Sequence, residues 1–173
     1  MTITIRTAEA GDVTVLSSLG AELFEQTYAG SIPPDEMASH ISQDFGEAQQ
    51  LDELLDQDVV SLLVEDAGAP RGFAQVRRRT LPVSGAQASV ELWRIYLDRQ
   101  LHGRGIAQEL LKRIGVIARD LEATGVWLAV WERNERAISF YAKHGFVPVG
   151  RQDFHVGGEV HCDTVLRASA DAF

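Results

Sequence analysis

The chain has 173 residues, of which 45% are hydrophobic, and a formal net charge of −9 from 16 basic and 25 acidic residues. This length and apolar share suffice for one core, so we expect a single domain over residues 1–173. The acidic balance argues against nucleic acid as the main partner, because phosphate binding requires a basic face. It is compatible with a cationic substrate.

The cysteine content, the N-terminal segment and the lengths of the apolar runs all favour the cytoplasm. The single cysteine, Cys162, excludes an internal disulfide and favours a reducing compartment. The segment from Met1 to Arg6 alternates like a strand and lacks the apolar core of a signal peptide. No apolar run approaches the roughly 20 residues that a membrane span needs. We therefore expect a cytoplasmic protein with no membrane partner.

The N-terminal third predicts one strand followed by helices. Ile3 and Ile5 alternate with polar residues, as in a short strand. From Ala10 to about Gly30, apolar residues recur every three or four positions, which predicts a helix. A second helix is expected from Pro33 to Phe45, since proline is tolerated in a first helical turn. A third, short helix would carry three leucines: Leu51, Leu54 and Leu55.

The middle of the chain changes to strand patterns. Residues Val59–Glu65 form a continuous apolar run, typical of a strand buried on both faces. After a turn at residues 67–70, Gly72–Arg77 is expected to pair back as an antiparallel strand. Residues Leu81–Gln87 predict a polar connection, and Val90–Leu97 predicts the next strand.

The C-terminal part predicts two helices around a strand. The first helix carries an apolar stripe from Ile106 to Leu121, and Gly125 is expected to end it. Residues Val126–Trp131 predict a buried strand. Asn134 is expected to cap a second helix that Gly145 closes.

Two further strands are expected to end the chain, at about Phe146–His155 and Glu159–Arg167, with a tight turn at Gly157-Gly158. The tail from Ala168 is expected to fray. The whole order predicts an α+β domain with a mixed, mostly antiparallel central sheet of about seven strands, covered by helices on both faces in three α/β/α layers.

The stretch Gln100–Ala107 lies where the strand ending at Leu97 turns into a helix. Such a turn leaves several backbone N–H groups pointing one way, and the helix macrodipole adds positive charge, so the turn can hold a phosphate or pyrophosphate. Glycines at positions 103 and 105 let the backbone approach an anion closely. Neither a P-loop lysine nor the small residue of a dinucleotide fingerprint follows them, because Ile106-Ala107-Gln108 occupies those positions.

The spacing Gln-x-x-Gly-x-Gly-x-Ala at residues 100–107 resembles the acetyl-coenzyme A motif of the GNAT (Gcn5-related N-acetyltransferase) superfamily. A second segment, Asn134-x-x-Ala-Ile-x-Phe-Tyr-x-x-x-Gly-Phe, resembles the second signature of that superfamily. The two are separated by one helix and one strand, as in the family. The resemblance implies a GNAT-like fold and acetyl transfer from acetyl-CoA to a primary amine, which attacks the thioester directly.

The resemblance also implies how acetyl-CoA is held. Backbone N–H groups from His102 to Ala107 would bind the pyrophosphate, and the strand end Ile95–Leu97 would pair with the pantetheine arm like an added strand. Asn134 would reach the pantetheine and Phe140 would pack along it, with helix capping and core packing as their structural alternatives. The candidate cofactor-binding residues are Ile95, Tyr96, Leu97, Gln100, His102, Gly103, Arg104, Gly105, Ile106, Ala107, Asn134, Phe140 and Lys143.

Tyr141 is the candidate general acid. Aminolysis of the thioester expels a thiolate whose conjugate acid has a pKa of about 8.5, and a phenol with a pKa of about 10 is nearly matched to it. The family places a tyrosine at this position for that role. The alternative is a buried tyrosine whose hydroxyl bonds to backbone.

Glu91 is the candidate general base. An alkylammonium with a pKa of about 10.4 is neutral at pH 7 in only about one molecule in 2,500, so a proton must be removed directly or through water. Glu91 lies in an otherwise apolar strand and shares its face with Trp93 and Ile95. Histone-type family members carry a catalytic glutamate at the corresponding place. The alternative is an ion pair with a neighbour such as Arg77 or Arg94.

The acceptor amine is expected to be small and polycationic. The segments Glu91–Tyr96, Val130–Ala137 and Phe154–Asp163 are similar to bacterial acetyltransferases of spermidine and spermine, and the acidic balance fits a polycation. A protein N-terminus or lysine, an antibiotic amine, and a non-catalytic acyl-CoA-binding module are the alternatives. A homodimer through the last strands would cover exposed edges. The histidine spacings predict no metal site. The candidate substrate-binding residues are Phe24, Tyr28, Glu91, Trp93 and His155.

Overall fold

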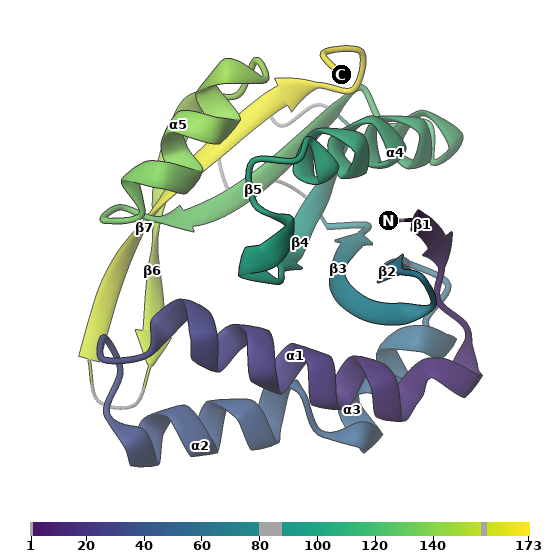
Figure 1. The fold of residues 1–173 in the computed structure, drawn as a ribbon. Coiled ribbons are helices and arrows are strands. Elements are labelled where there is room, and N and C mark those ends of the chain that lie inside the picture. The colour runs from purple at the N-terminus through teal and green to yellow at the C-terminus, as the bar shows by residue number, and fades with distance from the viewer. Residues whose placement is uncertain (1, 80–87, 157–158) are drawn as a thin grey trace. The chain divides into compact units, whose positions relative to one another are not determined.

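A computed structural model describes residues 2–79, 88–156 and 159–173, without the side chains of residues 154–156, 159 and 161. Seven strands form one sheet in the order β1-β2-β3-β4-β5-β7-β6 (Figure 1). The pairs β1/β2, β5/β7 and β6/β7 are antiparallel and β4/β5 is parallel, so the sheet is mixed. The strands are β1 (Ile3–Thr7), β2 (Val59–Asp66), β3 (Ala69–Arg77), β4 (Ser89–Leu97), β5 (Gly125–Trp131), β6 (Val147–Val156) and β7 (Glu159–Ser169).

The helices follow the predicted order, and the α+β class with a mixed seven-stranded sheet is confirmed. Pro34 occupies the first turn of its helix, where a missing N–H costs nothing. None of the helices that the structure describes is long and apolar enough to cross a membrane. They are α1 (Val13–Tyr28), α2 (Pro34–Asp44), α3 (Glu47–Leu55), α4 (Ile106–Asp120) and α5 (Glu135–Lys143), with short 3-10 turns η1 (Ala10–Asp12) and η2 (Arg99–Leu101).

The chain divides into two compact units, each considered by itself below. The first comprises residues 1–75 and 94–107, and the second comprises residues 76–93 and 108–173. Strands β3 and β4 therefore each contribute residues to both units.

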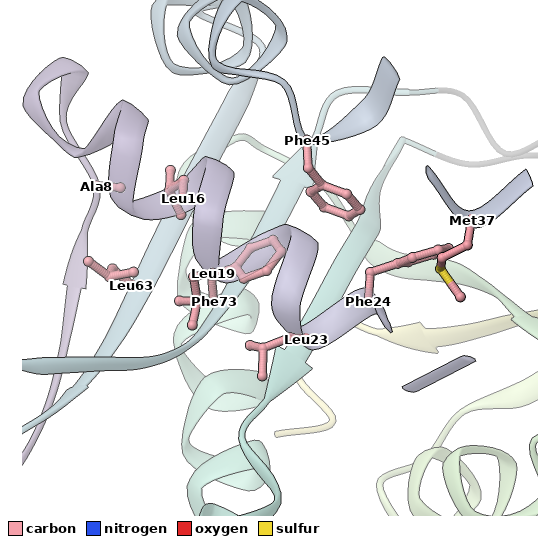
Figure 2. Packing of buried hydrophobic residues seen from close by; sticks show 9 residues of the cluster. All are labelled: Ala8, Leu16, Leu19, Leu23, Phe24, Met37, Phe45, Leu63 and Phe73. Atoms are coloured by element: carbon pink, nitrogen blue, oxygen red, sulfur yellow. The ribbon is translucent and has the colours of Figure 1, made fainter. Parts of the chain in front are cut away.

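The core of the first unit is an apolar cluster that centres on α1 (Figure 2). α1 turns Leu16, Leu23 and Phe24 inward at helical spacing, which the periodicity of the sequence predicts. Gly20 lies on the same face. Glycine suits this position because a Cβ there would collide with the ring of Phe45. The buried members of the cluster are Ala8, Leu16, Leu19, Leu23, Phe24, Met37, Phe45, Leu63 and Phe73.

The buried positions of the short helix α3 are polar. Of its three leucines, Leu54 is partly buried and packs against the core cluster. Leu51 and Leu55 are 39% and 65% exposed, whereas Gln50 and Glu53 are 0% and 4% exposed. The inward face of α3 is polar because Glu53 accepts a hydrogen bond from the buried Arg94, which is described below, and Gln50 donates to Glu53. A search for apolar residues at helical spacing does not detect a buried face that is polar.

Two details of the second unit correct the sequence prediction. α4 ends at Asp120, five residues before Gly125, because Glu122 adopts a left-handed φ of +58° and the N–H of Ala123 donates back to the carbonyl of Ala118 at 2.8 Å, which closes the helix. The C-terminal tail is not frayed. Ala170 is 3% exposed and its carbonyl accepts from Arg119 at 2.7 Å, while Phe173 stacks on Phe146 at 5.5 Å. The expected connection at 81–87 and the turn at Gly157-Gly158 lie outside the described residues.

Candidate functional site

The glycine loop of the first unit begins with a capped 3-10 turn. The carboxylate of Asp98 accepts from the N–H of Gln100 at 2.8 Å, and Leu101 is buried at 2% exposure. Gly103 and Gly105 adopt φ values of +75° and +78°, the left-handed region that glycine enters without a steric cost. A Cβ at either glycine would meet nothing within 4 Å, so the loop borders open space. This space is what a bound anion needs.

Not all the N–H groups of this loop point outward for an anion. Those of His102 and Arg104 donate to carbonyls of the turn itself, Arg99 and Leu101, at 3.1 and 3.4 Å. The imidazole Nε2 of His102 donates to the carbonyl of Leu97 at 3.0 Å. In this loop, which the structure describes in full, the N–H groups of Gly103, Gly105, Ile106 and Ala107 donate to no backbone carbonyl.

The strand end Ile95–Leu97 packs tightly on β3 in the same unit. A Cβ at Gly72 would lie 2.7 Å from the carbonyl oxygen of Tyr96, so only glycine allows this approach. The half-buried ring of Tyr96 packs against Phe73 and Phe24, with ring centroids 5.6 and 6.2 Å apart. The strand end is thus held in one position from both sides.

Phe24 and Tyr28, the substrate-binding candidates of α1, differ in exposure. Phe24 is 3% exposed and belongs to the core, whereas Tyr28 is half-buried and packs on it at 4.7 Å. His40 of α2 also stacks on Phe24, at 4.4 Å, and its Nδ1 lies 3.2 Å from Asp44. Burial lowers the pKa of His40, against the opposing effect of Asp44. The sequence analysis did not single out His40.

A buried polar network, which the sequence analysis missed, holds α3 to the sheet of the first unit. One guanidinium nitrogen of Arg94 donates to Glu53 and to the amide oxygen of Gln75, both at 2.7 Å. The amide of Gln75 in turn donates to Glu53 at 2.8 Å, and Gln50 donates to the same oxygen at 3.1 Å. The only sequence signal is the occurrence of Arg94 and Gln75 inside apolar strands.

Glu91 of the second unit is an ion-paired carboxylate. It is 4% exposed, and its Oε2 accepts a hydrogen bond from Nε of Arg77 and lies 3.7 Å from Arg79. Arg77 and Arg94 were the two partners expected from the sequence. Arg94 has the wrong parity along β4 to share a face with Glu91, and the structure selects Arg77. The same Arg77 guanidinium lies 3.7 Å above the ring of Trp93.

Helix α5 carries the remaining candidates of the second unit. Asn134 caps it by accepting from the N–H of Ala137 at 3.1 Å, so the structural alternative for this residue is observed. Phe140 is half-buried and packs on Tyr141 and His144, with centroids 5.3 and 4.5 Å apart. Tyr141 is 6% exposed and also packs on Phe146.

The last two candidates are Lys143 and His155. Lys143 is exposed in the last turn of α5, where a cation suits the helix dipole whether or not it meets a phosphate. His155 pairs through its backbone with Val160 in the β6/β7 ladder. Its side chain lies outside the described part of the chain.

Comparison with known proteins is consistent across sequence and fold. The family model described as the Acetyltransferase (GNAT) family matches residues 22–146. An uncharacterized N-acetyltransferase of Mycobacterium bovis is 30% identical over 155 residues, which cover 90% of this chain and 96% of that protein.

Two solved structures share the fold. The PaiA N-acetyltransferase of Thermoplasma acidophilum, in complex with coenzyme A, superposes with a TM-score of 0.79 at 22% identity, over 98% of this chain and 99% of the other. The spermidine N-acetyltransferase of Vibrio cholerae, in complex with CoA and spermine, gives a TM-score of 0.67 at 18% identity, over 98% and 96% of the two chains.

Proposed function

The chain belongs to the GNAT family of acetyltransferases, and we propose that the amine it acetylates is a small polycation. Membership makes it an acetyl-CoA-dependent N-acetyltransferase. The acceptor is the open question. A protein N-terminus, a protein lysine and an antibiotic amine are the competing acceptors.

The distribution of charge carries the proposal. Residues 7–70 contain fourteen aspartates and glutamates and neither lysine nor arginine. This span includes α1, α2 and α3. The resemblance to the GNAT family implies that acceptor specificity lies in these first helices and in the late hairpin. A surface of one sign attracts a polycation at long range and raises its encounter rate. The exposed acids of the three helices are Glu22, Glu25, Asp35, Glu47 and Asp52.

The fold neighbours agree with this choice without deciding it. The Vibrio cholerae enzyme of the same fold is a spermidine acetyltransferase that was crystallised with spermine. At 18% identity this likeness concerns the fold, so it supports only the capacity of such a fold to accept a polyamine.

Acetyl-CoA fits the glycine loop of the first unit. The unpartnered N–H groups of Gly103, Gly105, Ile106 and Ala107 stand at the start of α4, a helix of 15 residues, beside open space. Donors in this position suit a pyrophosphate. The strand end Ile95–Leu97 of the same unit would align the pantetheine arm.

In the proposed mechanism, one side chain takes a proton from the acceptor and another donates a proton to the leaving group. Acetyl-CoA supplies an activated acyl group. Glu91, directly or through water, takes a proton from the acceptor ammonium, and the free amine attacks the carbonyl carbon. As the C–N bond forms and the C–S bond breaks, Tyr141 donates its phenolic proton to the leaving thiolate. The nitrogen loses its second proton to water as it becomes an amide, and a proton from water restores the Tyr141 phenol.

We expect acceptors to be ranked by their charge. In a thiol-release assay with acetyl-CoA, kcat/KM should rise from butylamine through putrescine to spermidine and spermine, and the value for spermine should fall most steeply with added salt, because screening weakens long-range attraction. Butylamine and putrescine share a four-carbon chain, which makes them a matched pair. A lysine peptide or an aminoglycoside that outranks spermine at low and high salt would refute the polycation assignment.

Replacing Glu91 with glutamine is expected to lower the rate at neutral pH by about 100-fold, the lower end of the range of general-base catalysis. Part of the loss should be recovered at high pH, where more of the acceptor is already a neutral amine. The measurement is kcat/KM with spermidine from pH 6.5 to 9.5. An equal loss at every pH would indicate that Glu91 is a structural carboxylate.

A further inference from the structure

The side chain of Arg77 contacts two of the proposed acceptor-side residues at once. Its Nε donates to Glu91, and its guanidinium plane lies 3.7 Å from the centroid of the Trp93 ring. Glu91 and Trp93 are two positions apart on β4 and so project from the same face. Arg77 is the last residue of β3. It therefore connects Glu91, the proposed base, with Trp93, the other substrate-binding candidate on β4.

The burial of the Arg77–Glu91 pair indicates that Arg77 is the main counter-charge of Glu91. The side chains of Arg77 and Glu91 are 21% and 6% exposed. A carboxylate so deeply buried requires a counter-charge and a hydrogen-bond donor, and Arg77 provides both in one contact. Arg79 lies farther away, at 3.7 Å, and its side chain is 56% exposed. On β5 the residue opposite Glu91 is Trp127, which carries no charge.

We propose that Arg77 is a positioning residue for the proton-accepting carboxylate: it fixes the Glu91 side chain and supplies its counter-charge, while its stacking fixes Trp93. The inference rests on the proposed role of Glu91. Arg77 itself exchanges no proton with the substrate. A guanidinium suits this position because its planar fork bonds and stacks simultaneously, which a lysine ammonium cannot do.

The test compares Arg77→Gln, Arg77→Lys and the matched control Arg78→Gln, whose side chain is exposed on the adjacent position. The readouts are kcat and KM for spermidine from pH 6 to 9, together with Tm and the Kd of acetyl-CoA. For Arg77→Gln we expect about a 10-fold lower kcat and an acid limb of the kcat/KM profile moved to higher pH, because the carboxylate has lost its counter-charge. Arg77→Lys should restore the acid limb but only part of kcat. Arg78→Gln should match the parent protein.

Coupling to Glu91 separates this inference from the proposal beneath it. In the Glu91→Gln background, Arg77→Gln should cause little further loss if Arg77 acts through Glu91. A full further loss would overturn the inference and leave the role of Glu91 intact. Unchanged turnover in Glu91→Gln alone would instead remove the base assignment itself.

Two other results would overturn the positioning role. In the first, the acid limb of the kcat/KM profile does not move in Arg77→Gln and any loss of rate is matched by a lower Tm. The ion pair would then be purely structural. The other is a lower KM for spermidine at unchanged kcat. That result would mean that the Arg77 guanidinium occupies the cation site between carboxylate and indole and competes with the acceptor.

Discussion

Replacing Tyr141 with phenylalanine is expected to lower turnover by about 10- to 100-fold, with little change in the affinity for acetyl-CoA. The change removes one oxygen atom and leaves the ring, which is 6% exposed and packs between Phe140 and Phe146. Packing is therefore conserved while the proton donor is lost, and the upper end of the expected loss corresponds to the factor of about 100 at which general acid catalysis typically begins. Single-turnover rates and the Kd of acetyl-CoA are the measurements.

A more acidic leaving thiol provides the internal control for Tyr141. A thiolate that leaves readily needs less help from a proton donor, so the loss in Tyr141→Phe should shrink with an acetyl donor whose thiol has a lower pKa than that of coenzyme A. Turnover equal to that of the parent protein would exclude Tyr141 from the mechanism. A reduced rate with an unchanged ratio between the two donors would indicate a role in positioning instead.

Removing the buried guanidinium of Arg94 is expected to cause the largest loss of stability. Arg94→Ala leaves Glu53, which is 4% exposed, without the partner that donates to it at 2.7 Å. It also removes the donor to Gln75. Breaking a buried ion pair on one side costs about 3–5 kcal/mol because the remaining charge is stranded. The free energy of unfolding from urea titration, followed by near-UV absorbance or fluorescence, measures this loss.

Two further variants make the Arg94 result interpretable. Arg71→Ala removes a partner of Asp98 at 3.3 Å from a side chain that is 40% exposed, and should cost less than about 1 kcal/mol. The double variant Glu53→Gln with Arg94→Met leaves no buried charge but keeps an acceptor oxygen for Gln50 and Gln75. It should recover more than half of the loss. A loss in Arg94→Ala no larger than in Arg71→Ala would show that the buried pair contributes nothing net.

The candidate site divides into features that local sequence can specify and features that it cannot. Gly103 and Gly105 specify a left-handed turn before a helix by themselves, because the absence of a Cβ is a property of one residue. Asn134 caps α5 for a similarly local reason. The partner of Glu91 is different. Sequence alone left Arg77 and Arg94 as alternatives, and strand pairing together with the alternation of faces selects Arg77.

The same division explains the errors of the prediction. Nothing in the sequence indicated that Gln50 and Glu53 of α3 are buried. Glu53 is buried because Arg94, about 40 residues further along the chain, reaches it from β4, and Gln50 donates to Glu53. The tail after Ala168 lacks any strong pattern, yet it packs because Arg119 and Phe146 meet it. In both cases the decisive contact is distant in sequence.

The sequence by itself determined the fold class, the order of the elements, the family and the acetyl donor, because periodicity, turn chemistry and short motifs are written within a few tens of residues. Only the tertiary structure decided which charges are paired, namely Glu91 with Arg77 and Glu53 with Arg94, and which donors of the glycine loop remain open. The physical reason is that burial and pairing depend on what the fold brings against a side chain. Those neighbours come from segments whose separation along the chain carries no local signal.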